Sequence, residues 1–231
     1  MKTVGIIGGI APESTIEYYR QILGRHREQR RDGGNPSILI NSIDLHRMLS
    51  LIGSNDLPAV TDYLVAEMAR LAAAGADFGL FASNTPHIVF NEVARRSSIP
   101  LISIVEATGA AVLARGVRKP ALLGTRFTMQ GRFYPEVFSR SGIEVVAPQG
   151  EDQNYVHDKY MSELVNAAFL PETRDGLLRV VERLRDQRGI DGVILGGTEL
   201  PLILREPEYL GLPFFDTTRI HVEAVVARLR S

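Results

Sequence analysis

The sequence carries one short pattern twice, and this repeat is the feature that most limits its fold. In each copy an aspartate precedes a short apolar run that ends in small polar residues, and Asp77 and Asp191 are 114 residues apart, as are Ser83 and Gly197. Two further pairs have offsets of 116 and 113 residues, namely Gly8 with Gly124 and Pro100 with Pro213. The near-constant offset predicts two copies of one α/β unit. Chance is the alternative, because Asp followed by an apolar strand is common in α/β proteins.

Short apolar runs alternate with amphipathic stretches along the chain. The apolar runs predict strands at 4–7, 37–40, 78–82, 101–104, 121–123, 144–146, 193–195 and 213–215. The amphipathic stretches predict helices at 12–31, 58–74, 106–115, 129–139, 152–168, 172–188 and 217–230. This alternation predicts parallel sheets with helices on both faces. We therefore expect an α/β protein of two pseudo-symmetric domains, each with a mostly parallel sheet, with residues 1–108 plus 217–231 in the first and 109–216 in the second.

The polar cluster after one strand of each copy is a candidate ligand-binding loop. Ligands bind open α/β sheets beyond the carboxyl ends of the strands. Two such units facing each other would form a cleft, with the loop 83–85 on one wall and the loop 197–199 on the other. Small hydroxyl and amide groups before a helix suit a carboxylate or a phosphate. The alternative is plain helix capping, which the same residue types perform.

Composition excludes several classes of function. The 231 residues are 45% hydrophobic and carry a net charge of −1, so we expect neither a nucleic-acid partner nor a disordered chain. No apolar run is long enough for a membrane span and no secretory signal is evident, so we expect a cytoplasmic protein. Cysteine is absent, which excludes disulfides, thiolate metal sites and thiol catalysis. The histidines have no metal-ligand spacing, so we expect no metal.

A few single residues invite a functional interpretation. The run Gly5–Gly9 lacks the dinucleotide-binding spacing, so we interpret it as a tight turn from a strand to a helix that lines the floor of the cleft. Arg47 follows the second predicted strand and could hold a carboxylate with two parallel hydrogen bonds; a solvated surface arginine is the alternative. His87 follows Ser83 by four residues, within reach across one helical turn.

Four stretches of the chain, in this order, resemble the cofactor-independent aspartate/glutamate racemases, and the resemblance covers essentially the whole length. They are Met1–Gly9, Ser83–His87, Leu122–Met129 and Gly196–Leu202. The resemblance implies two pseudo-symmetric α/β domains with the active site between them, an amino-acid ligand and no cofactor. We also expect a homodimer.

The resemblance also exposes a departure at the two positions that matter most. In the family a thiol on each domain flanks the substrate α-carbon, one removing the α-proton and the other returning it on the opposite face. Inversion without a cofactor needs such a base and acid on opposite faces. Here Ser83 and Gly197 stand at these positions. The two-thiol mechanism is therefore impossible in this chain.

The resemblance implies a better preserved set of binding residues. Asn84, Thr85 and Thr198 match positions that hold the substrate α-carboxylate and amino group, and Arg47 falls where some members hold a distal carboxylate. A second basic group of some members aligns with Asn166. The other binding positions implied are the turn glycine Gly9 and the second-domain threonines Thr125 and Thr128.

Three hypotheses remain open. The first is an amino-acid racemase that acts on a small, dicarboxylic amino acid with other groups than thiols, namely Ser83 assisted by His87, with Glu199 opposite. A serine hydroxyl is too weak an acid to serve unaided, so this hypothesis requires activation. The second is a lyase or other isomerase that needs only one base on a small carboxylate. The third is a carboxylate-binding relative without catalysis.

Overall fold

The computed structural model describes residues 2–10, 12–29, 34–54 and 56–231, and the chain divides into two compact units. Unit 1 comprises Met1–Ile104 with His221–Ser231, and unit 2 comprises Val105–Ile220. Each unit contains a sheet that is wholly or mostly parallel, with helices packed against it, which confirms the expected α/β class. Among the described residues, none of the helices combines the length and apolar character that crossing a membrane requires.

Unit 1 is built on a three-stranded parallel sheet. Its strands are β1 (Thr3–Gly8), β2 (Ser37–Ser42) and β3 (Phe78–Phe81), in the order β2-β1-β3. The central strand β1 is buried almost throughout, as its apolar sequence predicts. A single bridge from Gly79 to Leu101 adds the start of a fourth strand beside β3.

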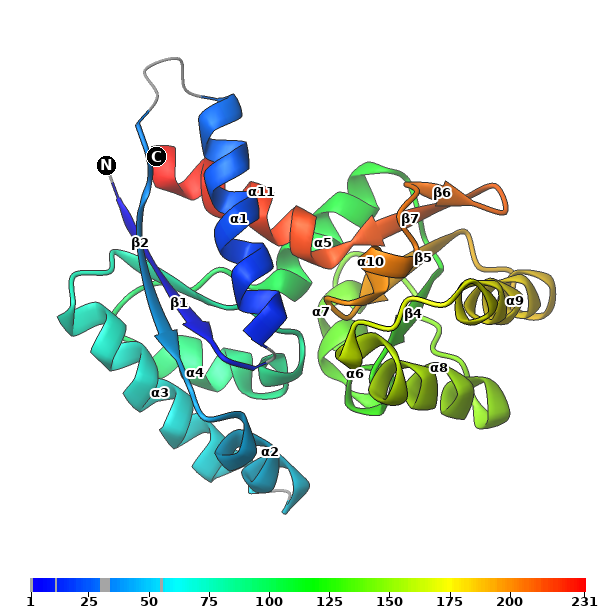
Figure 1. Cartoon of the computed structure of the whole chain (residues 1–231), viewed down its shortest axis with the longest axis horizontal. Coiled ribbons are helices and arrows are strands. Elements are labelled where there is room, and N and C mark those ends of the chain that lie inside the picture. The colour runs from blue at the N-terminus through cyan, green and yellow to red at the C-terminus, as the bar shows by residue number, and fades with distance from the viewer. Residues whose placement is uncertain (1, 11, 30–33, 55) are drawn as a thin grey trace. The chain divides into compact units, whose positions relative to one another are not determined.

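Helices cover both faces of this sheet (Figure 1). On one face α1 (Pro12–Glu28) and the end of α11 (Thr217–Arg230) pack against Val4, Ile6 and Leu80. On the other face, α2 (Leu45–Gly53), α3 (Leu57–Ala73) and α4 (Phe90–Arg96) pack against Ile7 and Phe81. The alternation of β1 side chains between the two faces follows from the strand period of two.

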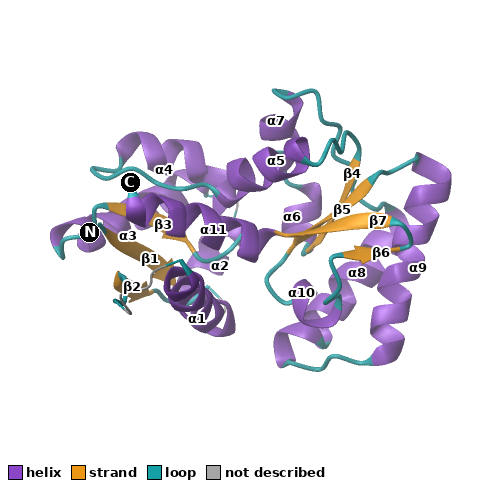
Figure 2. Ribbon diagram, turned by 90° about the horizontal axis from the view of Figure 1, so that it is seen from above, coloured by secondary structure: helices purple, strands orange, loops and turns teal. Residues whose placement is uncertain are grey.

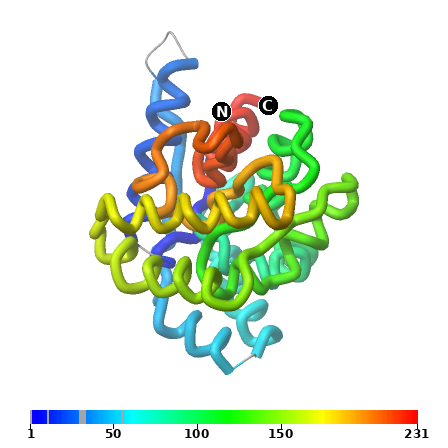
Figure 3. Tube along the Cα trace, turned by 90° about the vertical axis from the view of Figure 1, so that its right-hand side faces the viewer, coloured from blue at the N-terminus to red at the C-terminus, as the bar shows by residue number. Residues whose placement is uncertain are grey.

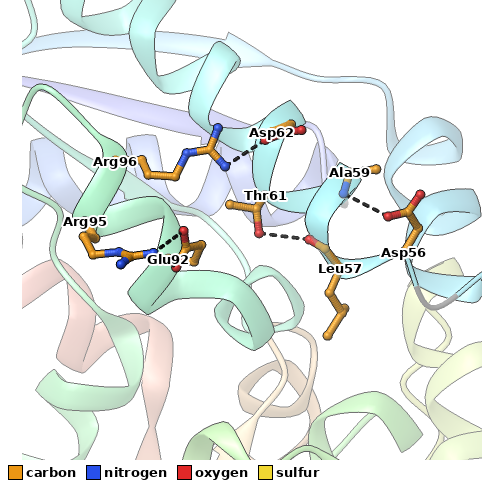
Figure 4. A network of polar contacts seen from close by, with 8 residues as sticks. All are labelled: Asp56, Leu57, Ala59, Thr61, Asp62, Glu92, Arg95 and Arg96. Atoms are coloured by element: carbon orange, nitrogen blue, oxygen red, sulfur yellow. Dashed lines mark hydrogen bonds and ion pairs between the residues drawn. The ribbon is translucent and has the colours of Figure 1, made fainter.

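Polar contacts surround the first turns of α3 and link this helix to α4 (Figure 4). The Asp56 carboxylate caps its first turn by accepting a hydrogen bond from Ala59 N at 3.1 Å. Arg96 of α4 forms an ion pair with Asp62 of α3 at 2.7 Å. Arg95 pairs with Glu92 within α4 and faces solvent. These contacts lie on the surface, and the ion pair between Arg96 and Asp62 joins α4 to α3.

Unit 2 contains a four-stranded sheet in the order β4-β5-β7-β6. Its strands are β4 (Pro120–Gly124), β5 (Gly192–Gly196), β6 (Glu208–Tyr209) and β7 (Leu212–Asp216). Only β6 runs antiparallel to its neighbour. In Figure 2, α5 (Ile104–Ala114) and α7 (Phe133–Ser139) lie on one side of this sheet, and α8 (Gly150–Ser162) and α9 (Pro171–Arg188) lie on the other.

The helices α8 and α9 run side by side over the main core of unit 2 (Figure 3). That core joins Val156 and Tyr160 of α8, Leu177 and Val181 of α9, and Leu195 of β5. The remaining helical elements are short: α6 (Arg126–Gln130), α10 (Leu200–Ile203) and two 3₁₀ helices, η1 (Thr85–Val89) in unit 1 and η2 (Leu164–Asn166) in unit 2.

Several predicted elements are wrong in detail. The predicted strands 101–104 and 144–146 are single bridges, because each segment makes only a few ladder bonds before the chain turns away, the first of them directly into α5. The predicted helix 129–139 breaks at Gly131, which separates α6 from α7. The predicted helix 152–168 ends at Ser162 and continues as η2. Helix α1 ends at Glu28, and residues 30–31 of that prediction lie outside the described residues.

The two units repeat one strand order once these bridges are counted. In unit 1 the order is β2, β1, β3 and Leu101; in unit 2 it is Val146, β4, β5 and β7. Asp77 and Asp191 also have the same structural role, because each carboxylate accepts backbone hydrogen bonds at the start of the neighbouring strand. Asp77 bonds Thr3 N at 2.6 Å, and Asp191 bonds the N–H groups of Arg118 and Lys119 at 2.7 Å. The repeated aspartate is thus a structural tie.

Candidate functional site

The loop after β3 presents the first group of predicted site residues. Ser14 of α1 donates a hydrogen bond to Ala82 O at 2.7 Å and so holds the end of the strand. Ser83 and Thr85 are partly exposed, whereas Asn84 is buried. The chain then enters η1, which has Pro86 in its first turn. The structure therefore brings Ser83, Asn84 and Thr85 together at the carboxyl end of β3, as the sequence predicts.

His87 is bound on both sides by the backbone. Its Nδ1 contacts the carbonyl oxygens of Ser83 and Asn84 at 3.1 and 3.2 Å, and its Nε2 faces the N–H of Ile104 at 3.2 Å. Carbonyl oxygens only accept, so Nδ1 carries the proton and Nε2 is the acceptor. Burial, followed by the neighbouring His221, lowers the pKa of His87 to about 3. His87 is therefore neutral over the physiological range.

This geometry favours a structural role for His87 over the expected activation of Ser83. The imidazole nitrogen that points toward Ser83 meets its backbone oxygen, and the other nitrogen is occupied by Ile104. The ring also stacks on Phe90, with ring centroids 5.0 Å apart. His87 thus holds the backbone of the loop at Ser83 and Asn84 in place.

Gly9 lies at the carboxyl end of β1, in a turn that only glycine fits easily. Its φ is +80°, and a Cβ there would lie 2.5 Å from the carbonyl oxygen of Ile43. Its N–H donates to Thr15 Oγ1 at 2.9 Å, which joins the turn to α1. The close backbone approach supports the interpretation of this glycine as a tight turn.

Arg47 lies on α2, a helix that the sequence interpretation missed although Asp44 caps it. The Arg47 guanidinium lies over the ring of Tyr63, 4.4 Å from its centroid. Both residues line a surface groove of about 360 Å³, together with Glu67 and Arg70. The structure therefore places Arg47 in a groove to which Glu67 adds an acidic side chain and Arg70 a basic one.

The loop after β5 presents the second group. Gly197, Thr198 and Glu199 lie between β5 and α10. A Cβ added at Gly197 would lie 2.4 Å from Cε2, 2.6 Å from the hydroxyl oxygen and 2.8 Å from Cζ of Tyr160. The ring of Tyr160, which comes from α8, thus fills the space that a side chain at position 197 would take.

Glu199 and Tyr160 form a buried polar pair. Each residue is only 5% exposed. The Tyr160 hydroxyl donates a hydrogen bond to Glu199 Oε2, and the Thr198 hydroxyl donates to the same oxygen at 2.8 Å. Burial, followed by the charge of Glu199, raises the pKa of the Tyr160 phenol well above its usual value. The hydroxyls of Tyr160 and Thr198 thus both donate hydrogen bonds to a carboxylate in the core of unit 2.

The other predicted binding residues of unit 2 have local partners. The Thr125 hydroxyl caps α6 by accepting from Thr128 N at 3.4 Å, and the two hydroxyls lie 3.3 Å apart. The exposed Asn166 ends η2 and donates to Ser162 O at 3.0 Å. The capping alternative therefore accounts for the contacts of Thr125. Among the described residues, no three His, Cys, Asp or Glu side chains gather as a metal site would need.

Tyr160 is the residue that sequence reasoning missed. It lies 39 residues from Glu199 in the chain, inside an amphipathic helix, where its spacing marks it only as a core residue. The contact depends on how α8 packs on β5. A local pattern in the sequence could not have revealed it.

Comparison with known proteins gives a consistent result along the chain. The family model for Asp/Glu/Hydantoin racemase matches residues 7–225. A Yersinia pestis protein provisionally assigned as an Asp/Glu racemase has a crystal structure that is 32% identical, with a TM-score of 0.90 and 100% of both chains covered. An aspartate racemase homologue from Pyrococcus horikoshii OT3 is 34% identical, with a TM-score of 0.86 and 100% of both chains covered.

A curated relative gives a partial match. The broad specificity amino-acid racemase RacX from Bacillus subtilis (strain 168) is 27% identical over 153 residues, which is 62% of this chain and 63% of RacX. The family model alone covers far more than half of the sequence. The chain therefore belongs to the Asp/Glu/Hydantoin racemase family.

Proposed function

We propose that this protein is an amino-acid racemase that moves the α-proton of a small, dicarboxylic amino acid without pyridoxal phosphate. The observation that carries the proposal is family membership over residues 7–225 together with the full-length similarity to an aspartate racemase homologue. Asn84, Thr85 and Thr198 would bind the α-carboxylate and amino group. Arg47 would bind the distal carboxylate.

The catalytic groups must be other than a pair of thiols, because the chain contains no cysteine. Inversion at the α-carbon needs one group that removes the proton and another that returns it on the opposite face. Ser83 is the candidate group in unit 1, and Glu199 is the candidate group in unit 2. The buried, hydroxyl-solvated carboxylate of Glu199 supports its part in this proposal.

A second candidate function is a lyase or isomerase reaction that needs a single base on a small carboxylate. The contacts of His87 favour it, because both imidazole nitrogens are engaged by backbone groups. Ser83 then has no help from His87, whereas Glu199 retains an ionisable side chain. One base suffices to exchange an α-proton or to labilise a bond next to it.

Incubation in deuterated water with a panel of L- and D-amino acids tests the proposal. We expect the α-proton NMR signal to disappear while chiral chromatography shows the opposite enantiomer. Exchange or carbon-dioxide release without inversion would favour the one-base reaction. Saturable binding without exchange would mean a carboxylate-binding protein, and neither binding nor exchange across the panel would refute the proposal.

Arg47 offers a test of substrate class. Arg47→Ala should weaken binding of a dicarboxylic amino acid and spare a monocarboxylic one, because it removes the partner of the distal carboxylate. Calorimetric titration measures both. Arg95→Ala is the matched control, since this exposed arginine of the same unit pairs only locally with Glu92. Equal effects on both ligands would remove Arg47 from the site.

We also propose a homodimer in the cytoplasm that does not bind nucleic acid. The net charge of −1 supports the last point, because phosphate neutralisation needs an excess of basic residues. Sedimentation velocity gives the oligomeric state, and a monomer at micromolar concentration would contradict the dimer.

A further inference from the structure

Gly197 and Tyr160 are complementary in shape. A side chain at position 197 would overlap the Tyr160 ring, since its Cβ would lie 2.4 Å from Cε2. The Tyr160 hydroxyl oxygen lies 2.6 Å from the same Cβ position. A hydroxyl from another element thus stands next to the point from which a side chain of residue 197 would begin.

The Tyr160 hydroxyl is also hydrogen-bonded to a proton acceptor. It donates to Glu199 Oε2, and Thr198 donates to the same oxygen. Tyr160 and Glu199 are both almost fully buried, so bulk water does not compete with this hydrogen bond. A phenol joined to a carboxylate in this way can pass a proton along the bond in either direction.

We propose that the Tyr160 hydroxyl, coupled to Glu199, is the proton carrier of the loop after β5 and takes the place of a side chain at position 197. This inference rests on the proposed function and adds to it a catalytic residue from α8. It applies equally to racemisation and to a one-base reaction.

The relay moves two protons together, so that Tyr160 does not become a free phenolate. When the substrate α C–H bond breaks, the proton goes to the Tyr160 oxygen while the proton of Tyr160 moves to the Glu199 carboxylate. The electron pair of the C–H bond stays on the α-carbon, where the substrate carboxylate delocalises it. In the reverse direction the Glu199 carboxyl returns its proton to Tyr160, which protonates the α-carbon. The raised pKa of the phenol agrees with a relay in which Tyr160 never holds a full negative charge.

The test compares Tyr160→Phe with Tyr155→Phe. Tyr155 lies on the same helix and packs against Gly176, so this control removes a hydroxyl from α8 without touching Glu199. For Tyr160→Phe we expect kcat of α-proton exchange to fall by about 100-fold or more, and KM to stay within about three-fold. Tyr155→Phe should exchange at the wild-type rate. Circular dichroism and thermal melting check that both variants fold.

Glu199→Gln provides a second variant. It keeps an oxygen acceptor for both hydroxyls but cannot take up a proton, so kcat should fall as in Tyr160→Phe. Glu199 is also a candidate group of the proposed function, so this variant supports the relay only together with a change at Tyr160. If Tyr160→Phe does not fold, a fluorotyrosine at position 160 takes its place, because it keeps the hydroxyl and lowers the pKa of the phenol. Its kcat should then differ from the wild-type value, and an unchanged kcat would overturn the relay.

The outcomes separate this inference from the proposed function. Wild-type kcat in folded Tyr160→Phe, or a raised KM with unchanged kcat in that variant, would overturn the Tyr160 relay and leave the proposed function standing. Wild-type kcat in Glu199→Gln would overturn the relay and also the part of Glu199 in the proposed function. Absence of exchange in the wild-type protein would overturn both.

Discussion

Gly197→Ala is a minimal change with a large expected effect. It adds one methyl group, and the backbone of Gly197 is outside the left-handed region, so alanine itself causes no backbone strain. The added Cβ would lie within 3 Å of three atoms of Tyr160, a separation that real Cβ atoms essentially never show. The ring has little room to move, because it is packed in the core of unit 2. Tyr160 must therefore shift and weaken its bond to Glu199.

The magnitude follows from these two costs. Overpacking a core by a methyl group costs about 1–3 kcal/mol. Loss of a hydrogen bond to a charged group costs about 1.5–3 kcal/mol. Alanine returns about 0.4–1 kcal/mol through the unfolded state. We expect the free energy of unfolding to fall by about 2–5 kcal/mol.

Urea denaturation followed by circular dichroism measures this change, and a double-mutant cycle with Tyr160→Ala tests its cause. Tyr160→Ala alone leaves a cavity, which costs about 3–5 kcal/mol. In the double variant the overlap and the Tyr160–Glu199 bond are both gone, so its destabilisation should be smaller than the sum of the single effects by about 2.5–6 kcal/mol, which is the sum of these two costs. Additivity within about 0.5 kcal/mol, or a harmless Gly197→Ala, would refute the reasoning.

Three further predictions concern stability. Asp191→Ala should lower the free energy of unfolding by about 2 kcal/mol, and by more than Asp77→Ala, because among the described residues Asp191 accepts two backbone N–H groups and Asp77 accepts one. The opposite ranking in urea denaturation would contradict this. Gly24→Ala should stabilise the protein by about 0.5–1 kcal/mol, because Gly24 lies inside α1 and its Cβ would meet open space; a loss in the same assay would show a missed contact. The third is a pH dependence, because burial lowers the pKa of His87 from its ordinary value of 6.5 to about 3 in the folded state. The unfolded state therefore takes up the proton first, and stability is lost as the pH falls from about 6.5 toward 3. Between pH 7 and 5 the loss from His87 is about 2 kcal/mol, so His87→Gln should show a shallower pH dependence in the same assay, and an unchanged slope would contradict it.

The local pattern of the sequence predicted the fold class and most of the elements. Alternating apolar runs and amphipathic stretches depend on periodicity, which is a local property. The predictions failed where a few neighbouring residues decide the outcome. Leu101 makes one bridge before α5 begins, and Gly131 interrupts a helical stretch. Helix α2 was missed, although Asp44 caps it.

The roles of the candidate site residues depended more on packing. The sequence identified the two loops and the missing thiols, because the offset of the repeat and the residue types can be read directly. It also suggested that His87 would assist Ser83, since four residues span one helical turn. The structure shows that the imidazole nitrogens bond to backbone groups, and no residue pattern specifies that orientation.

By itself, the sequence determined that the protein has two related α/β units, a polar loop after one strand in each, and no cysteine. These conclusions need only residue identity and spacing along the chain. The tertiary structure alone decided that Tyr160 occupies the space beside Gly197 and bonds to Glu199. That contact joins residues from separate elements, and only the packing of α8 against β5 brings them within bonding distance.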